Sequence, residues 1–247
     1  MISKSQISFI KSLQQKKIRK EHGLFVVEGL KSVSEFIHSH YTVDTIYYIE
    51  NVMPKLGNLS HNIKPIEISI SELTKISALS SPQQILALVK IPEHRTLTTQ
   101  MLKGCFTIAL DGIQDPGNLG TIIRTADWFG IKYLVCSGDT VDAYNSKVVQ
   151  ATMGSLSRVH VSYTNLDKFL EQADVPVFGA LLEGNSIYKT EFGSEGILIL
   201  GNEGNGIRSE ISRRIQFPVT IPRFGEAESL NVAVSASIFC SEMRRNS

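Results

Sequence analysis

Residues 105–247 alternate regularly between strand-like and helix-like segments. Short apolar runs have the length of buried strands, and apolar side chains recur at helical intervals in the segments between them. The expected strands are 105–111, 133–138, 158–163, 175–182, 196–201 and 217–222. The expected helices are 118–130, 145–156, 165–173, 207–214 and 229–245. This order predicts an α/β fold in which helices cover both faces of a parallel sheet.

The first 91 residues show a separate and less regular α/β pattern. Helical spacing occurs in 5–20, 30–40 and 69–79, and strand-like apolar runs occur at 24–29, 44–50 and 84–91. Ser69 or Ser71 is expected to cap the third of these helices. The segment 92–104 is polar, lacks clear periodicity and begins with proline, which favours a linker. We therefore expect one domain at 1–91, a linker at 92–104 and a second domain at 105–247.

The net charge of +1 is unevenly distributed along the chain. Residues 1–100 carry 12 Lys and Arg against 8 Asp and Glu, whereas the remainder carries 13 against 16. The first twenty residues contain six basic side chains and no acidic one: Lys4, Lys11, Lys16, Lys17, Arg19 and Lys20. Such a cluster is compatible with a polyanionic partner, although a solvated helix face explains it equally well.

The sequence also argues against membrane, metal and disulfide-stabilised classes. No run of about 18 apolar residues occurs, and the first twenty residues lack the apolar stretch of a signal peptide. We therefore expect a cytoplasmic protein without a membrane segment. Cys105, Cys136 and Cys240 are far apart and lack C-x-x-C spacing, so neither a disulfide framework nor a metal site is expected. We interpret all three as buried small hydrophobic residues.

Three stretches at expected strand ends have unusual polar sequence, and ligands of open α/β sheets bind at that edge. The first stretch is 110–130. Residues 115–117 form an expected turn, and Asn118 is expected to cap the helix that follows. Arg124 falls outside the apolar stripe of this helix, where it could reach a phosphate. Taken alone, a surface arginine is the simpler interpretation.

The second stretch, GNEGNGI at 201–207, follows a late strand. Its glycine order is G-x-x-G-x-G, whereas a dinucleotide site has G-x-G-x-x-G at the first strand–helix turn and an acidic residue about 20 positions later. No Gly-Lys-Ser/Thr follows, which argues against a P-loop. The third stretch, 221–245, leads from a strand through a loop into a helix that is apolar on nearly every side. Such a helix must be enclosed by its own domain, by a second subunit or by both.

Three motifs in these stretches are similar to those of one enzyme family. They are N-L-G-x-x-x-R-T-A (118–126), L-G-N-E-G-x-G-I (200–207) and I-P-x-x-G-x-x-x-S-L-N-V-x-V (221–234). In order and spacing they resemble the motifs of the SpoU/TrmH branch of the SPOUT RNA methyltransferases. Residues 16–37 and 80–89 carry a weaker resemblance to the small substrate-binding domain, of ribosomal-protein-like α/β fold, that precedes the catalytic domain in many members.

The resemblance implies a fold and an activity. The second domain would form a deep trefoil knot, bind S-adenosylmethionine and form a homodimer through the knot region. The expected reaction is methyl transfer to a ribose 2′-hydroxyl of RNA that the basic first domain engages. Ribosomal RNA is preferred because the two-domain layout resembles rRNA-modifying members. The alternatives are a tRNA 2′-O-methyltransferase and an RNA-binding dimer that has lost catalysis, while the glycine order disfavours a nucleotide-dependent dehydrogenase.

The resemblance also implies which residues bind the cofactor and the target ribose. Arg124 would engage the target phosphate and ribose, and we favour transition-state electrostatics over base catalysis because arginine rarely deprotonates. The polar positions that orient Arg124, the ribose or the cofactor match Asn118, Glu203, Ser229 and Asn231. The backbone positions that contact the cofactor match Leu200, Gly201, Asn202, Ile221 and Leu230. Glycines there would let backbone groups approach the adenine and ribose closely.

Each polar residue of this set also has a purely structural interpretation. Asn118 and Ser229 could cap helices, Glu203 could be a turn residue, and Asn231 could be a buried hydrogen-bonding side chain. The joint match to three motifs favours the functional interpretation over these.

Overall fold

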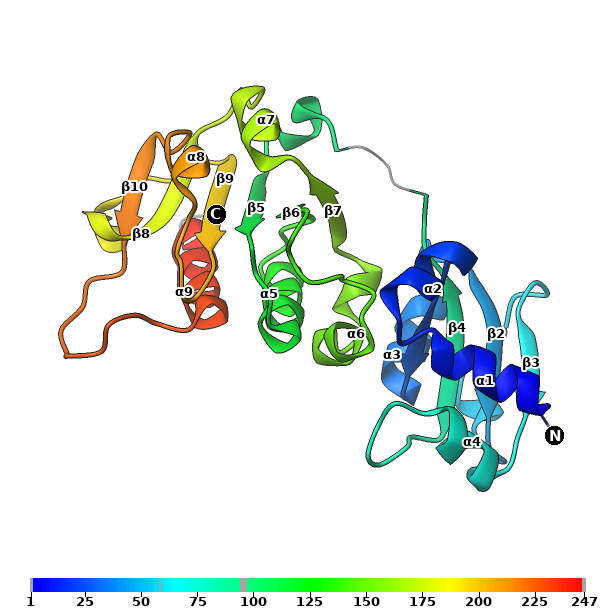
Figure 1. Cartoon of the computed structure of the whole chain (residues 1–247). Helices are drawn as coiled ribbons and strands as arrows, with labels where there is room; N and C mark the ends of the chain where they lie inside the picture. Colours follow the sequence, from blue (N-terminus) through cyan, green and yellow to red (C-terminus); the bar gives the residue numbers. More distant parts are fainter. Residues whose placement is uncertain (1, 58, 94–96, 246–247) are drawn as a thin grey trace. The chain divides into compact units, whose positions relative to one another are not determined.

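The structure is a computed structural model that describes residues 2–57, 59–93 and 97–245 (Figure 1). Its contacts divide the chain into two compact units. The first comprises Met1–Glu93 and Asp142–Ser157, and the second comprises His94–Val141 and Arg158–Ser247. Residues 142–157 therefore pack with the first unit, although they lie inside the expected second domain. Residues 94–96 of the expected linker lie outside the described residues, as do 246–247.

The second unit is built on a six-stranded sheet in which every neighbouring pair of strands is parallel, in the order β10-β8-β9-β5-β6-β7. The strands are β5 (Phe106–Asp111), β6 (Tyr133–Ser137), β7 (His160–Thr164), β8 (Val177–Ser186), β9 (Gly196–Gly201) and β10 (Phe217–Thr220). The parallel sheet expected from the sequence is confirmed. Because all the strands run in one direction, their carboxyl ends reach the same edge of the sheet.

Helices cover both faces of this sheet (Figure 1). On one face, α7 (Leu166–Glu171) and α8 (Ser209–Ser212) share a hydrophobic cluster with alternate residues of β5, β6 and β9. Residues that alternate with these, such as Leu198 and Leu200, point to the other face and are buried there as well. That face carries α5 (Pro116–Trp128) and α9 (Val232–Arg244), which pack against each other. Short 3₁₀ turns lie at η2 (Thr99–Leu102) and η4 (Ile187–Lys189).

The first unit contains a four-stranded sheet in the order β1-β4-β2-β3. Its strands are β1 (Leu24–Glu28), β2 (Val43–Tyr48), β3 (Lys64–Glu67) and β4 (Ile85–Lys90), and its helices are α1 (Lys4–Ser12), α2 (Lys16–His22), α3 (Leu30–Ile37), α4 (Ile70–Ile76) and α6 (Ser146–Thr152). It also holds the 3₁₀ turns η1 (Met53–Lys55) and η3 (Ser155–Ser157). The sequence did not predict β3, because this mostly exposed edge strand has almost no apolar signal.

Helix α4 begins at one of the two serines expected to cap it. The Ser69 hydroxyl accepts a hydrogen bond from the Glu72 N–H at 3.2 Å, and the Glu72 carboxylate accepts one from the Ser69 N–H at 2.9 Å. The same carboxylate accepts a bond from the Ile2 N–H at 2.8 Å. These hydrogen bonds lower the pKa of Glu72 to about 2, and the bond from the Ser69 N–H contributes most. The capping box thus also fixes the N-terminal segment.

The expected helix over 5–20 is broken into α1 and α2, and the Arg19 side chain accounts for the break. Its Nη1 donates to the carbonyls of Leu13 and Gln14, at 2.9 and 2.8 Å, where α1 ends. Its Nε donates to the Asp142 carboxylate at 3.1 Å, and Arg19 is only 2% exposed. Arg19 is therefore a structural cation that supplies donors to the carbonyls of the turn that directly follows α1. It does not belong to the exposed basic cluster to which the sequence assigned it.

Two of the three cysteines are buried as expected, and the third is not. Burial raises the pKa of Cys136 and raises that of Cys240 to about 12. Cys105 is half-buried, and its thiol donates to the carbonyls of Met101 and Leu102. In the described part of the chain, no helix is long and apolar enough to cross a membrane, and no group of three or more His, Cys, Asp or Glu could hold a metal ion.

We predict that Arg19→Met destabilises the protein by about 3 kcal/mol, because it leaves Asp142 and two carbonyls without their buried cation. Urea unfolding measures the effect. Lys20→Met, at an exposed position of the same helix, is the matched control and is expected to change the free energy of unfolding by less than about 0.5 kcal/mol. Equal unfolding midpoints for the two variants would contradict the role given to Arg19.

Candidate active site

Helix α5 begins at Asp115 and not at Asn118. The Asp115 Oδ1 accepts a hydrogen bond from the Asn118 N–H at 2.8 Å, and Pro116 occupies the first helical position. The expectation that Asn118 caps this helix is wrong, because an aspartate followed by proline is the stronger start signal. The consequence is that the Asn118 amide is directed elsewhere.

Asn118 lies at the centre of a network that joins the three motifs. Its Nδ2 donates to the Glu203 carboxylate, and its Oδ1 accepts a hydrogen bond from Asn231 Nδ2 at 2.9 Å. Glu203 lies in the loop after β9, and Asn231 lies at the start of α9. The structure therefore brings together three of the five polar residues that the sequence assigned to the site.

The segment before α9 departs from two structural interpretations made from the sequence. The cap of α9 is Asn231, whose Oδ1 accepts from the N–H groups of Ala233 and Val234 at 3.0 and 3.3 Å. The helix therefore begins at Val232 instead of 229, and Asn231 is exposed instead of buried. Ser229 is exposed and is not the cap. Among the described residues, no hydrogen bond engages its hydroxyl.

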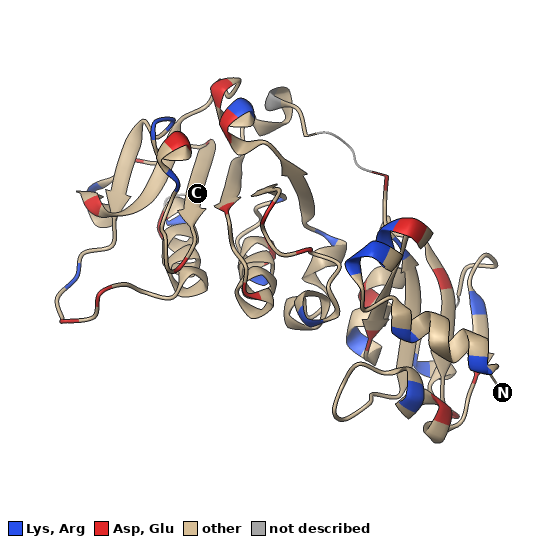
Figure 2. Ribbon diagram, in the orientation of Figure 1, with Lys and Arg blue, Asp and Glu red and all other residues tan. Residues whose placement is uncertain are grey.

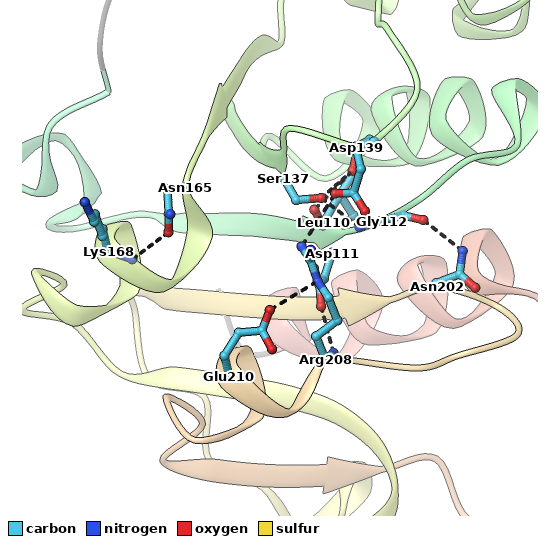
Figure 3. Close-up of polar contacts among 11 residues, drawn as sticks. Leu110, Asp111, Gly112, Ser137, Asp139, Asn165, Lys168, Asn202, Arg208 and Glu210 are labelled. Carbon is cyan, nitrogen blue, oxygen red and sulfur yellow. Dashed lines mark hydrogen bonds and ion pairs between the residues drawn. The ribbon is translucent and has the colours of Figure 1, made fainter.

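The loop after β9 is closed on itself by Asn202. The backbone N–H and C=O of Asn202 both bond to Gly206, at 3.0 and 2.9 Å. The Asn202 Oδ1 accepts from the N–H groups of Gly204 and Asn205. Its Nδ2 donates to the Gly112 carbonyl at 2.8 Å, as Figure 3 shows. Gly206 has φ +67°, a conformation that favours glycine. Asn202 therefore uses most of its polar groups to shape the loop.

Gly201 is required by the loop itself. A Cβ on Gly201 would collide with the backbone of Gly206 and Ile207. The family resemblance implied that this glycine permits close approach of the cofactor, and the structure shows that it permits close approach within its own loop. Gly201 therefore allows two backbone segments of one loop to touch.

Sequence reasoning missed Asp111 and Arg208. The Asp111 carboxylate, 1% exposed at the end of β5, accepts hydrogen bonds from the Arg208 N–H and Nε, both at 2.8 Å, and a further one from Nη2 (Figure 3). The bond to Asp111 raises the pKa of Arg208. A usable signal was the aspartate that ends an otherwise apolar buried strand, since a buried carboxylate needs a partner.

At the carboxyl end of β9, some backbone N–H and C=O groups do not pair with β8 and are available to a ligand. Pairing of β9 with β5 continues to Gly201, whereas its pairing with β8 ends at Ile199. Successive residues of a strand direct their N–H and C=O groups to opposite sides. One of Leu200 and Gly201 therefore directs both groups toward the side where β8 no longer pairs.

Arg124 lies on an exposed stripe of α5 with Thr121 and Trp128, and Trp128 is 84% exposed. Within the described part of the chain, no hydrogen bond or ion pair engages the Arg124 guanidinium. At about 100° per residue, Arg124 is about a third of a turn around the helix from Asn118. The structure thus leaves Arg124 available and joins neither it nor Ser229 to the network.

Two family profiles cover most of the chain. Residues 105–241 match the SpoU rRNA methylase family, and residues 4–87 match the MRM3-like substrate-binding domain. The chain belongs to the SpoU rRNA methylase family. The resemblance seen in the three sequence motifs is thereby confirmed.

Several relatives of this SpoU-family chain align with it over nearly its whole length. A 23S rRNA guanosine-2′-O-methyltransferase of Bacillus subtilis is 32% identical over 95% of this chain and 94% of its own. The solved structure of a TrmH-family protein of Porphyromonas gingivalis has a TM-score of 0.91 at 37% identity and covers 100% of both chains. An AdoMet-bound rRNA methyltransferase of Sinorhizobium meliloti has a TM-score of 0.86 at 29% identity, covering 99% and 97% of the two chains.

We predict that Gly201→Ala disrupts the loop after β9 and lowers the free energy of unfolding by about 2 kcal/mol. The added Cβ would collide with the backbone of Gly206 and Ile207. Gly204→Ala is the matched control, because its Cβ would lie 3.5 Å from the nearest atom, Asn202 Oδ1, an ordinary contact. Thermal unfolding compares the two. A Gly201→Ala protein as stable as Gly204→Ala would contradict the packing described for the loop.

Proposed function

We propose that this chain transfers the methyl group of S-adenosylmethionine to a ribose 2′-hydroxyl of RNA, with ribosomal RNA as the substrate. The observation that carries the proposal is the hydrogen-bonded network of Glu203, Asn118 and Asn231, because it gathers polar groups from all three motifs at one edge of the sheet. Names of relatives support the substrate, since several of them are 23S rRNA methyltransferases.

The residues present fit this cofactor. Backbone groups of Leu200 or Gly201 are free of β8, and the loop 221–231 makes no backbone–backbone hydrogen bond within the described residues before Asn231 accepts one from α9. The half-exposed Leu230 side chain adds apolar surface for an adenine ring. We assign cofactor contacts to Leu200, Gly201, Asn202, Ile221 and Leu230. When bound, S-adenosylmethionine supplies an electrophilic methyl group.

Arg124 is assigned to the RNA target. A ribose hydroxyl is a weak nucleophile and must lose its proton as it attacks. A guanidinium stays protonated, so Arg124 would orient the phosphate and stabilise the developing negative charge, while the phosphate accepts the proton. Its exposure and lack of a partner in the described chain suit this role. Asn118, Glu203, Ser229 and Asn231 would hold the reacting groups in place.

The first unit is assigned to RNA binding. Lys4, Lys11, Lys16, Lys17 and Lys20 are exposed on α1 and α2, where Figure 2 shows basic residues grouped. Such side chains bind phosphates without reading sequence. We propose a substrate-binding domain at 1–91, a linker at 92–104 and a catalytic domain at 105–247.

Limited proteolysis tests these boundaries. Cleavage inside the domains with 92–104 left intact would count against them.

We further propose a homodimer, a trefoil knot near the cofactor loop and a cytoplasmic location. Family resemblance supports the dimer and knot, and the exposed apolar side chains of Trp128 on α5 and Val234 on α9 are surfaces that a second copy would cover. The RNA substrate supports the location. Recovery of the protein with membranes in cell fractionation would contradict the cytoplasmic assignment.

Arg124→Ala is expected to lower the rate of methyl transfer at least about 100-fold, because it removes the charge that stabilises the attacking oxygen. Affinity for S-adenosylmethionine should stay within a few fold. Transfer of labelled methyl groups to RNA measures the rate, and Lys132→Ala, exposed before β6 at the opposite edge of the sheet, is the control. Unchanged turnover in Arg124→Ala would reject the role, and transfer to tRNA alone would favour the alternative substrate.

Sedimentation of the full chain is expected to give twice the mass of 27.3 kDa. Truncation from residue 229 removes Asn231 and α9, and should abolish both stable folding and dimer formation, because α9 covers one face of the central sheet. A stable, soluble monomer from the truncated chain would contradict the knotted dimer. A monomeric full-length chain would contradict the dimer alone.

A further inference from the structure

The loop after β9 leaves the sheet and returns to it at the same residue. In the parallel pairing of β5 with β9, Gly201 lies opposite Asp111. Seven residues later, Arg208 binds the Asp111 carboxylate through both its backbone N–H and its guanidinium. Between these points, Asn202 donates to the Gly112 carbonyl at 2.8 Å (Figure 3). Both ends of the loop 201–208 are therefore attached to the end of β5.

The charges around Arg208 make it a poor site for RNA phosphate. Besides Asp111, its guanidinium lies 3.5 Å from the Asp139 carboxylate and 3.9 Å from that of Glu210 (Figure 3). Three carboxylates more than neutralise one cation, so a phosphate would be repelled. Asp111, in turn, is buried and needs its cation, because an unpaired carboxylate in such a place is costly. We therefore interpret the Asp111–Arg208 pair as a structural contact of the loop and not as an RNA-binding site.

The loop carries residues on which the proposed function depends. Glu203 reaches Asn118 from within it, and Gly201 and Asn202 form its first part, directly after Leu200 of β9. Movement of the loop by about 1 Å would change both the backbone that meets the cofactor and the carboxylate that orients Asn118. Residues 203–206 are exposed, whereas Ile207, next to Arg208, is partly buried against the hydrophobic cluster that includes Ala109 and Ile199.

We propose that Asp111 and Arg208 are positioning residues, which hold the loop 201–208 in the conformation that binds S-adenosylmethionine. The inference rests on the proposed function. Arginine is needed because its planar fork binds one carboxylate through two nitrogens while the N–H binds the other oxygen. A lysine at this position would keep the charge and lose the fixed geometry.

The test compares Arg208→Met and Arg208→Lys with Arg214→Met. Arg214 follows the same short helix, α8, and pairs with Asp167 and Glu171 at 2.7 and 3.1 Å, away from the loop. It therefore reports the loss of an ordinary arginine–carboxylate pair near α8. Calorimetry measures the Kd for S-adenosylmethionine, and hydrogen exchange follows the amides of residues 203–206.

Arg208→Met is expected to weaken cofactor binding about tenfold or more, since hydrogen bonds to a charged group are lost. Arg208→Lys should be intermediate, and Arg214→Met should bind like wild type. The loop amides should exchange faster in the Arg208 variants only, and the KM for S-adenosylmethionine should rise while that for RNA does not. Asp111→Asn combined with Arg208→Met should cost less than the two single effects added.

Wild-type cofactor affinity in Arg208→Lys, or in a folded Arg208→Met, would overturn the inference and leave the proposed function standing. Equal losses in Arg208→Met and Arg214→Met would also overturn it, because the effect would then be general destabilisation. A wild-type protein that binds no S-adenosylmethionine would overturn the proposed function and this inference together.

Discussion

The Asn118 amide holds together segments that lie far apart in the chain. One of its two polar atoms donates to Glu203 after β9, and the other accepts from Asn231 at the start of α9. An amide suits this position because it offers a donor and an acceptor at once, whereas a carboxylate or a hydrocarbon would leave a partner unsatisfied. The network depends on the parallel sheet, which brings the carboxyl ends of β5 and β9 to one edge.

Two buried or half-buried arginine–aspartate pairs support the two units by the same physical logic. Arg19 ends α1 and satisfies Asp142 in the first unit, while Arg208 closes the loop 201–208 on Asp111 in the second. In both pairs the guanidinium binds an aspartate carboxylate. The Arg19 guanidinium also binds the carbonyls after α1, and the Arg208 backbone N–H binds the same aspartate as its side chain. Removing one member leaves the other uncompensated, so these charges constrain conformation beyond what hydrophobic burial specifies.

The sequence predicted the sheet but was less informative about helix starts and turns. Apolar runs such as 106–111 and 196–201 are buried on both sides, which makes their signal strong, whereas the exposed β3 had almost none. Cap positions failed at Asn118 and Ser229 because neighbouring residues, Asp115 and Asn231, compete for the same role. At Asp115 the proline that follows was the local signal that marks the helix start.

The sequence motifs predicted several residues of the candidate site but not the contacts between them. Asn118, Glu203 and Asn231 were named from the sequence, but their mutual hydrogen bonds were not, since they are 85 and 113 residues apart. Asp111 and Arg208 were missed because their pairing depends on where the loop returns to the sheet. Gly201 was identified, but its close contact with Gly206 and Ile207 was not predicted, because close approach within one loop leaves no periodic signal.

The most direct test of the central claim is to incubate the protein with labelled S-adenosylmethionine and RNA, digest the RNA to nucleosides and separate them. We expect the label to appear in 2′-O-methylated nucleosides from ribosomal RNA. Label on a base, or RNA that stays unlabelled while the cofactor is bound, would contradict 2′-O-ribose transfer by this chain.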